Sequence, residues 1–203
     1  MAGSDVIAVI VSDEVALDAD GISVATSVGN NAALVIGGAL ADGGSVTNAS
    51  GRQVTILSAG NDSSKSFNVV GTDVNGASLT ENVTGANAGT ATSSGYFKTI
   101  ASITAVGNPA GNVSAGINAN AADVIFAGRT RLKGFSFVSG GTAGKANIRN
   151  GSVTGTEVVQ FRSIGTDDSS EDPFIPDEGI LFKDGCFVTF VVPQFDLMMF
   201  YHA

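Results

Sequence analysis

The chain has 203 residues, with 27 Gly, one Cys, one His and 14% charged side chains, against about 25% charged in typical globular domains. Ten basic residues stand against 19 acidic ones, so the formal net charge is −9. This balance argues against direct nucleic-acid binding, which needs a basic patch, and a single Cys excludes an internal disulfide framework. No apolar run approaches the ~18 residues of a membrane span, so we expect no membrane partner.

The first fifty residues have the least regular pattern. Residues 6–11 form an apolar run that predicts a strand. This run is too short for the core of a signal peptide and follows an Asp rather than a basic region, so we expect a chain that starts at or near Met1 and is made in a cytoplasm. Residues 12–20 favour one helical turn, and residues 34–40 predict a second apolar strand.

Four runs of β-branched and aromatic residues follow, each bounded by Gly, Asn, Asp or Ser. They predict strands over residues 53–57, 66–70, 78–83 and 96–106. Between the second and third runs lies Asp73-Val74-Asn75-Gly76. Asn-Gly supplies the positive φ that a tight turn needs, so this segment predicts a β-hairpin.

The sequence changes character near residue 128, because nine of the twelve Phe lie beyond it. Turns at Asn150-Gly151 and Lys183-Asp184-Gly185, and a polar acidic loop over residues 165–179, separate the apolar runs. The last run is strongly apolar, so we expect it to be tied into a sheet. Strands are predicted over residues 132–138, 145–149, 156–161, 180–182, 186–192 and 195–201.

These patterns predict an all-β chain with little helix, since strong helix formers other than Ala are scarce and Gly is frequent. We expect two small antiparallel β-sandwich or barrel modules, Ig-like or jelly-roll-like. The predicted organisation is an N-terminal arm with the first strands (residues 1–50), a first module (residues 51–128) and a second module (residues 129–203), with a boundary near residues 119–128. Residues 1–128 carry a net charge of −7, and residues 129–203 carry −2.

Two kinds of loop motif resemble ligand sites. Residues 140–144, Gly-Gly-Thr-Ala-Gly, resemble a phosphate loop, but such a loop needs Lys-Ser or Lys-Thr followed by a helix. Lys145 instead precedes Ala146 and a predicted strand, so we predict a hairpin turn. The carboxylate clusters in residues 18–21 and 167–172 resemble calcium ligands but lack the spacing of an EF-hand loop, so we predict solvated loops there.

Catalytic chemistry has little support in the sequence. His202 is the single His, and Cys186 begins an apolar strand, where a thiol is usually buried. Paired Glu carboxylates leave glycoside cleavage open, yet the chain has no Trp and two Tyr with which to build sugar platforms. We therefore expect no catalytic residue, no metal site and no cofactor, and a protein that is not an enzyme.

Several segments resemble known proteins. Residues 52–63, 67–76, 80–85 and 96–104 resemble a module of tailed-bacteriophage virion structural proteins. Residues 131–134 with 139–144, and residues 179–185, resemble a second β-module of phage structural proteins. Together they span most of residues 50–203, as strings of turn and strand residues rather than a chemical signature. The resemblance implies a virion protein with no active site to carry over.

Within that family, capsid decoration (cement) proteins, neck or tail proteins and fibre proteins share modules. We expect a decoration protein that is synthesised in the host cytoplasm, lies on the outer capsid surface, binds the major capsid protein and self-associates as a homotrimer. A phage neck, tail or fibre component is one alternative. A host-receptor or glycan-binding adhesin is another, and it would need a cleft of clustered aromatic residues.

Two sets of residues are candidates for the interface. The apolar N-terminal run lies outside both predicted modules, so we expect it to add a strand to a neighbouring subunit or to the capsid. The less acidic second module is expected to supply self-contact, since burying like charges at close range is costly, with its cations paired to carboxylates across the interface. The candidates are Val6, Ile7, Val9, Ile10 and Val11 in the run, and Arg129, Arg131, Lys133 and Arg149 in the second module.

Overall fold

The computed structural model describes residues 6–13, 16–139, 141–163, 170–171, 174–191 and 195–202. Within these residues the chain forms sixteen β-strands and no helix, so the all-β prediction is confirmed. The chain divides into two compact units. We call residues 16–119 the internal unit, and residues 1–15 together with 120–203 the terminal unit.

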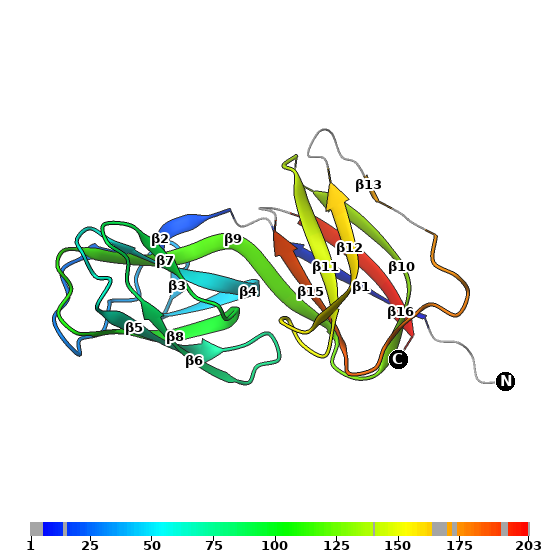
Figure 1. Cartoon of the computed structure of the whole chain (residues 1–203), viewed down its shortest axis with the longest axis horizontal. Coiled ribbons are helices and arrows are strands. Elements are labelled where there is room, and N and C mark those ends of the chain that lie inside the picture. Colours follow the sequence, from blue (N-terminus) through cyan, green and yellow to red (C-terminus); the bar gives the residue numbers. More distant parts are fainter. Residues whose placement is uncertain are drawn as a thin grey trace. The chain divides into compact units, whose positions relative to one another are not determined.

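The internal unit is built on the strand order β9-β4-β8-β5-β6, with β2 paired to β9 and with β3 and β7 paired to β4 (Figure 1). Its core contains the fully buried side chains of Ile22, Val54, Phe67, Phe97 and Ile103. The strands are β2 (Asp18–Thr26), β3 (Ala41–Asp42), β4 (Ser45–Ser58), β5 (Ser66–Thr72), β6 (Ser78–Thr84), β7 (Thr90–Thr92), β8 (Phe97–Val106) and the first half of β9 (Val113–Phe126).

The predicted hairpin at residues 73–76 is confirmed, because β5 and β6 pair antiparallel on either side of it. Gly76 has a φ of 79°, in the left-handed region that favours glycine. The Asp73 Oδ1 atom accepts hydrogen bonds from the backbone N–H groups of Asn75 (2.8 Å) and Ala77 (2.9 Å). The turn is therefore fixed by one carboxylate and one glycine.

Two predictions near the start of this unit are wrong. Residues 34–40 form no strand, although Leu34 is buried and its backbone N–H donates to the carbonyl of Ile103. The backbone N–H groups of Gly37 and Gly38 both donate to the carbonyl of Ile22 (3.0 Å each), so this segment does not follow the regular ladder of a strand. The helical turn expected over residues 12–20 is absent from its described part, where β1 runs to Asp13 and β2 starts at Asp18.

The terminal unit consists of two sheets. One has the order β1-β16-β10-β13, with β14 also paired to β10, and the other contains β12-β11-β15 and the second half of β9. Figure 1 shows the blue β1 beside the red β16, with β11, β12 and β15 in the other layer. The strands are β1 (Val6–Asp13), β10 (Thr130–Ser139), β11 (Gly144–Asn150), β12 (Thr156–Ser163), β13 (Ser170–Glu171), β14 (Ile180–Phe182), β15 (Cys186–Val191) and β16 (Phe195–His202).

The core of the terminal unit lies between these two sheets. Leu197 and Met199 of β16 are fully buried and belong to the same cluster as Ile148 and Phe190 of the facing sheet. Residues on alternate positions of β16, such as Met198, are exposed. This period of two places one face of each strand in the core and the other at the surface.

The N-terminal arm is corrected by the structure. All eight residues of β1 pair with the chain's own β16, from Val6 opposite His202 to Asp13 opposite Phe195. Val11 is 6% exposed and Val9 packs against the core, so the run completes the sandwich instead of leaving it. The apolar character that suggested a partner is explained by a partner strand about 190 positions further along the same chain.

The domain division agrees with the prediction at one end and differs at the other. The chain passes from one unit to the other between Ala119 and Asn120, at the start of the predicted boundary 119–128 and inside the continuous strand β9. Residues 1–15, predicted to belong with the first strands, group with the end of the chain instead. Counted by unit, the internal unit has three basic and six acidic residues, a net of −3. The terminal unit has seven basic and thirteen acidic residues, a net of −6. The predicted difference in charge, a strongly acidic first part and a nearly balanced second part, therefore does not hold for the two units.

The hairpin predicted for residues 140–144 is wrong as well. The strands on either side of this segment, β10 and β11, belong to different sheets, so the chain crosses from one layer of the sandwich to the other. A strand, not a helix, follows the glycines, as the argument against a phosphate loop expected. A Gly-rich turn signal marks a change of direction but does not reveal whether the next strand pairs with the previous one.

Candidate functional site

The predicted interface cations on β10 hold a segment of their own chain. Arg131 donates through Nη1 to the carbonyl oxygens of Glu178 (2.9 Å) and Gly179 (3.4 Å). Lys133 donates through Nζ to the carbonyl of Asp177 (2.7 Å). These two side chains therefore fix residues 177–179 beside β14. Arg129 is exposed, between β9 and β10.

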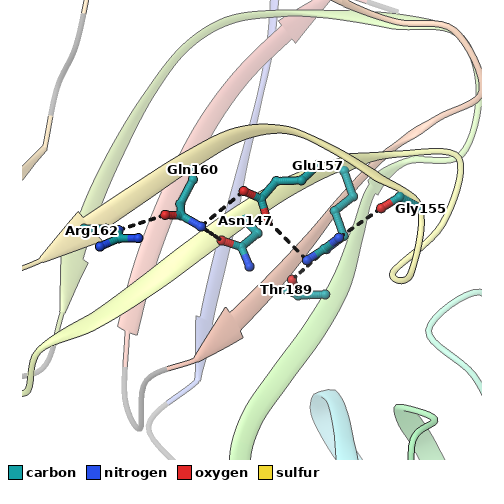
Figure 2. Close-up of polar contacts among 7 residues, drawn as sticks. Asn147, Gly155, Glu157, Gln160, Arg162 and Thr189 are labelled. Atoms are coloured by element: carbon teal, nitrogen blue, oxygen red, sulfur yellow. Dashed lines mark hydrogen bonds and ion pairs between the residues drawn. The ribbon is translucent and has the colours of Figure 1, made fainter.

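Arg149 of β11 is the centre of a polar network that includes side chains of β12 and β15. Figure 2 labels the partners of Arg149, which are Gly155, Glu157 and Thr189. Its Nη1 donates to the Gly155 carbonyl (2.9 Å), its Nε donates to Thr189 Oγ1 (3.2 Å), and its Nη2 lies 3.4 Å from a Glu157 carboxylate oxygen. The side chain is 22% exposed. Arg149 therefore ties three strands together, and its charge is already paired within the chain.

The network continues along β12. Gln160 donates through Nε2 to Asn147 Oδ1 (2.9 Å) and to Glu157 Oε1 (3.2 Å), and its own Oε1 accepts from Arg162 Nε (2.8 Å). Asn147 and Thr189 are each 4% exposed, so the long side chains of this network cover the polar groups beneath them. Figure 2 shows Arg162 at the end of this chain of contacts.

Lys145 and Arg162 form an unusual pair at that end. They lie directly opposite each other on β11 and β12. Like charges opposite each other on a sheet are destabilising, and among the described residues neither has a carboxylate within ion-pair distance. Arg162 also donates to Gln160 Oε1 (2.8 Å), but the facing charge of Lys145 still costs stability, and such a cost is typical of a binding position.

Two cavities meet at Arg162. The larger, about 540 Å³, is lined mainly by apolar side chains, including Phe135, Phe161 and Ile180. The smaller, about 390 Å³, is lined by Ala143, Gly144, Lys145, Arg162, Ser163 and Val191. The site can therefore offer an apolar surface and two positive charges to one ligand. We call the larger cavity the β12 cleft.

A second candidate surface lies on the outward face of β1 and β16. Ile10 is 66% exposed and lies opposite Met198, which is 38% exposed. Next to them Ala8, also exposed, lies opposite Phe200. Within the described residues β1 pairs with β16 alone, so its other edge carries unpaired backbone groups. Of the five predicted residues in this run, Val6, Ile7 and Ile10 are exposed at the surface.

The single Cys and the single His of the chain lie outside the β12 cleft. Cys186 is 1% exposed, and burial raises the pKa of its thiol to about 12, so the thiol is protonated at neutral pH. His202 lies at the end of β16, where its carbonyl accepts a hydrogen bond from Thr130 Oγ1 (2.6 Å). The described part of the chain contains no group of three or more His, Cys, Asp or Glu placed to hold a metal ion.

The sequence alone did not identify Lys145, Arg162 or the β12 cleft. The Asn150-Gly151 turn did not give the register of the cation pair, because a β-bulge between Ile148 and Arg149 shifts the pairing by one residue. The cleft had no local signal either, because it depends on how two sheets are spaced.

No family model, no curated protein and no solved structure matches this chain. A search of the described residues finds no helix long and apolar enough to cross a membrane.

Proposed function

We propose that this chain is a non-enzymatic structural protein of a tailed-bacteriophage virion, of the capsid decoration type. The resemblance of its turn and strand segments to phage structural proteins supports the proposal. The all-β architecture agrees with that resemblance. In this role the protein lies on the outer capsid surface as a self-associating, trimeric cement that binds the major capsid protein.

The single observation that carries the proposal is the outward face of β1 and β16. An apolar sheet face beside an open strand edge is a typical protein-binding surface, because it offers both apolar area and unpaired backbone groups. A shell contact built on it would bury at least ~1,000 Å², the usual lower bound for a stable specific interface. Bridging adjacent capsid subunits in this way would oppose rupture of the shell under the pressure of packaged DNA.

Electron microscopy of the intact virion tests the proposal. We expect density for this chain repeated over the icosahedral shell, with β1 and β16 at the shell contact. Density confined to the portal vertex or the tail would replace the proposal with the neck, tail or fibre alternative. Binding of the purified protein to host cells or glycans, with no binding to capsids, would favour the adhesin.

A further inference from the structure

Phe174 is the most exposed large apolar side chain in the described part of the chain, at 88%. It lies at the β12 cleft, whose lining also includes Phe135, Phe161 and Ile175. An aromatic side chain held in water beside an apolar cleft is a typical anchor for a protein contact, because aromatic residues dominate the energetics of interfaces.

The charges around the cleft are of both signs. Arg162 lines the cleft, and Lys145, opposite it on β11, lines the smaller cavity that Arg162 shares. Among the described residues neither has a carboxylate partner. Asp177 and Glu178 follow Phe174 in sequence, and the Glu178 side chain is 92% exposed, with Arg131 at 4.0 Å. One surface therefore carries an apolar anchor, two carboxylates, an apolar cleft and two cations.

We propose that residues 174–178 of one copy dock in the β12 cleft of a second copy. Phe174 lies against the apolar lining, and the carboxylates of Asp177 and Glu178 pair with Lys145 and Arg162. This contact deepens the self-association in the proposed function and rests on it. It needs no capsid, so its failure would leave capsid binding as a separate question.

Charge complementarity identifies the second copy as the partner. In a chain of net charge −9 most of the surface repels another copy, so a stable contact needs a local cationic site. Residues 174–178 of this chain fit such a site, because they combine an exposed aromatic side chain with two carboxylates. That segment is also preorganised, because Arg131 and Lys133 fix the backbone carbonyls of residues 177–179.

The docking segment and the cleft lie on one surface of each copy, because Phe174 itself lines the cleft. Two copies can therefore exchange their segments reciprocally about a two-fold axis, which is the isologous form of contact. The contact predicts pairs of copies and does not by itself build the trimer of the proposed function.

Photo-crosslinking of the full-length chain tests the position of Phe174. Benzoylphenylalanine at position 174 should give a product of twice the chain mass, with the attachment among the residues that line the β12 cleft. Mixing isotope-labelled and unlabelled chains shows that the two halves come from different copies. The matched control carries the same probe at Val35, an exposed position of the internal unit, and should give no such product. Products of single-chain mass alone, or attachment outside the cleft, would overturn the proposal.

Charge reversal tests the ion pairs. By sedimentation equilibrium at low ionic strength, Arg162→Glu and Asp177→Lys should each weaken self-association about tenfold or more, and the double variant should recover most of it. Lys183→Glu, a reversal of an exposed cation outside the cleft, should leave association unchanged. Circular dichroism checks that each variant keeps its β spectrum. A wild-type protein that stays monomeric, or a double variant as weak as the singles, would show that this contact is wrong.

Discussion

Cys186 shows how one buried side chain links stability to pH. The folded state raises the pKa of its thiol from 9.0 to about 12, because burial disfavours the thiolate. The folded state therefore keeps its proton where the unfolded state loses it. The contribution of this thiol to the free energy of unfolding is fully present below pH 9. It is lost as the pH rises from 9 towards 12, and the total loss is at most about 4 kcal/mol.

Denaturant unfolding at several alkaline pH values checks this prediction. Between pH 9 and 11 the free energy of unfolding of the wild type should fall more steeply than that of Cys186→Ala, by up to about 1.4 kcal/mol per pH unit. A disulfide reagent should leave the native thiol unmodified at pH 8 and react once the chain is unfolded. Equal slopes for both proteins, or rapid reaction of the native thiol, would contradict the assigned burial.

Gly71 is a second position where one atom decides stability. A Cβ at this residue would lie 1.9 Å from the Thr99 carbonyl oxygen, because β5 and β8 pass each other at a register shift. We expect Gly71→Ala to lower the free energy of unfolding by about 2–4 kcal/mol. Gly29→Ala is the matched control, since a Cβ there meets nothing within 4 Å, and its effect should stay within about 0.5 kcal/mol. A urea titration that found both variants equally stable would refute the close approach.

At the scale of a strand, β1 combines a buried face with an exposed one. Val11 is 6% exposed and its neighbour Ile10 is 66% exposed. Val11→Asp buries a carboxylate without a partner and should lower the free energy of unfolding by roughly 3 kcal/mol or more. Ile10→Asp should change it by less than about 1 kcal/mol.

Thermal unfolding followed by circular dichroism separates the two variants. A free N-terminal arm, as the sequence alone suggested, would make them equivalent, because neither residue would then belong to a core. The difference between adjacent positions is therefore a direct measure of the pairing between β1 and β16.

The strands that the sequence predicted are those whose side chains carry the signal. Runs of β-branched and aromatic residues lie within β4, β5, β8 and β16. The long strand β9 was missed because Ala, Asn and Gly dominate it. Its place is set by neighbours instead, since Ala115 and Ala121 are fully buried and a Cβ at Gly116 would meet the Asp18 carbonyl oxygen at 1.9 Å.

The geometry of the candidate site could not be predicted from local sequence patterns. Arg131 and Lys133 were expected at an interface and are engaged within the chain, because sequence does not show that residues 177–179 lie beside β10. The Lys145–Arg162 pair depends on the β-bulge between Ile148 and Arg149, which the turn sequence does not predict. The cleft follows from the spacing of two sheets, which no local pattern records.

For the whole molecule, the exposed face of β1 and β16 is where the proposed function is most easily tested. Ile10→Asp should weaken binding of the purified protein to capsids at least about tenfold, since a charge placed in an apolar contact loses its water. The unfolding temperature should change little. Val35→Asp, at a 74% exposed position of the internal unit, is the control and should bind as the wild type does. Co-sedimentation with capsids that lack this protein measures both variants. Equal binding by Ile10→Asp and wild type would remove this face from the shell contact.

The register of β1 and β16 places Val6 opposite His202, so the first and last described residues of the chain form one backbone pair. The hydrogen bonds of an antiparallel ladder run perpendicular to its strands. A force that pulls these two residues apart therefore loads one pair at a time and peels the ladder open like a zipper, whereas sliding the strands past each other would load every bond at once. A covalent link between the two ends would prevent this unzipping. We expect such a link to raise the force that unfolds the terminal unit in single-molecule pulling from attachment points inside the chain.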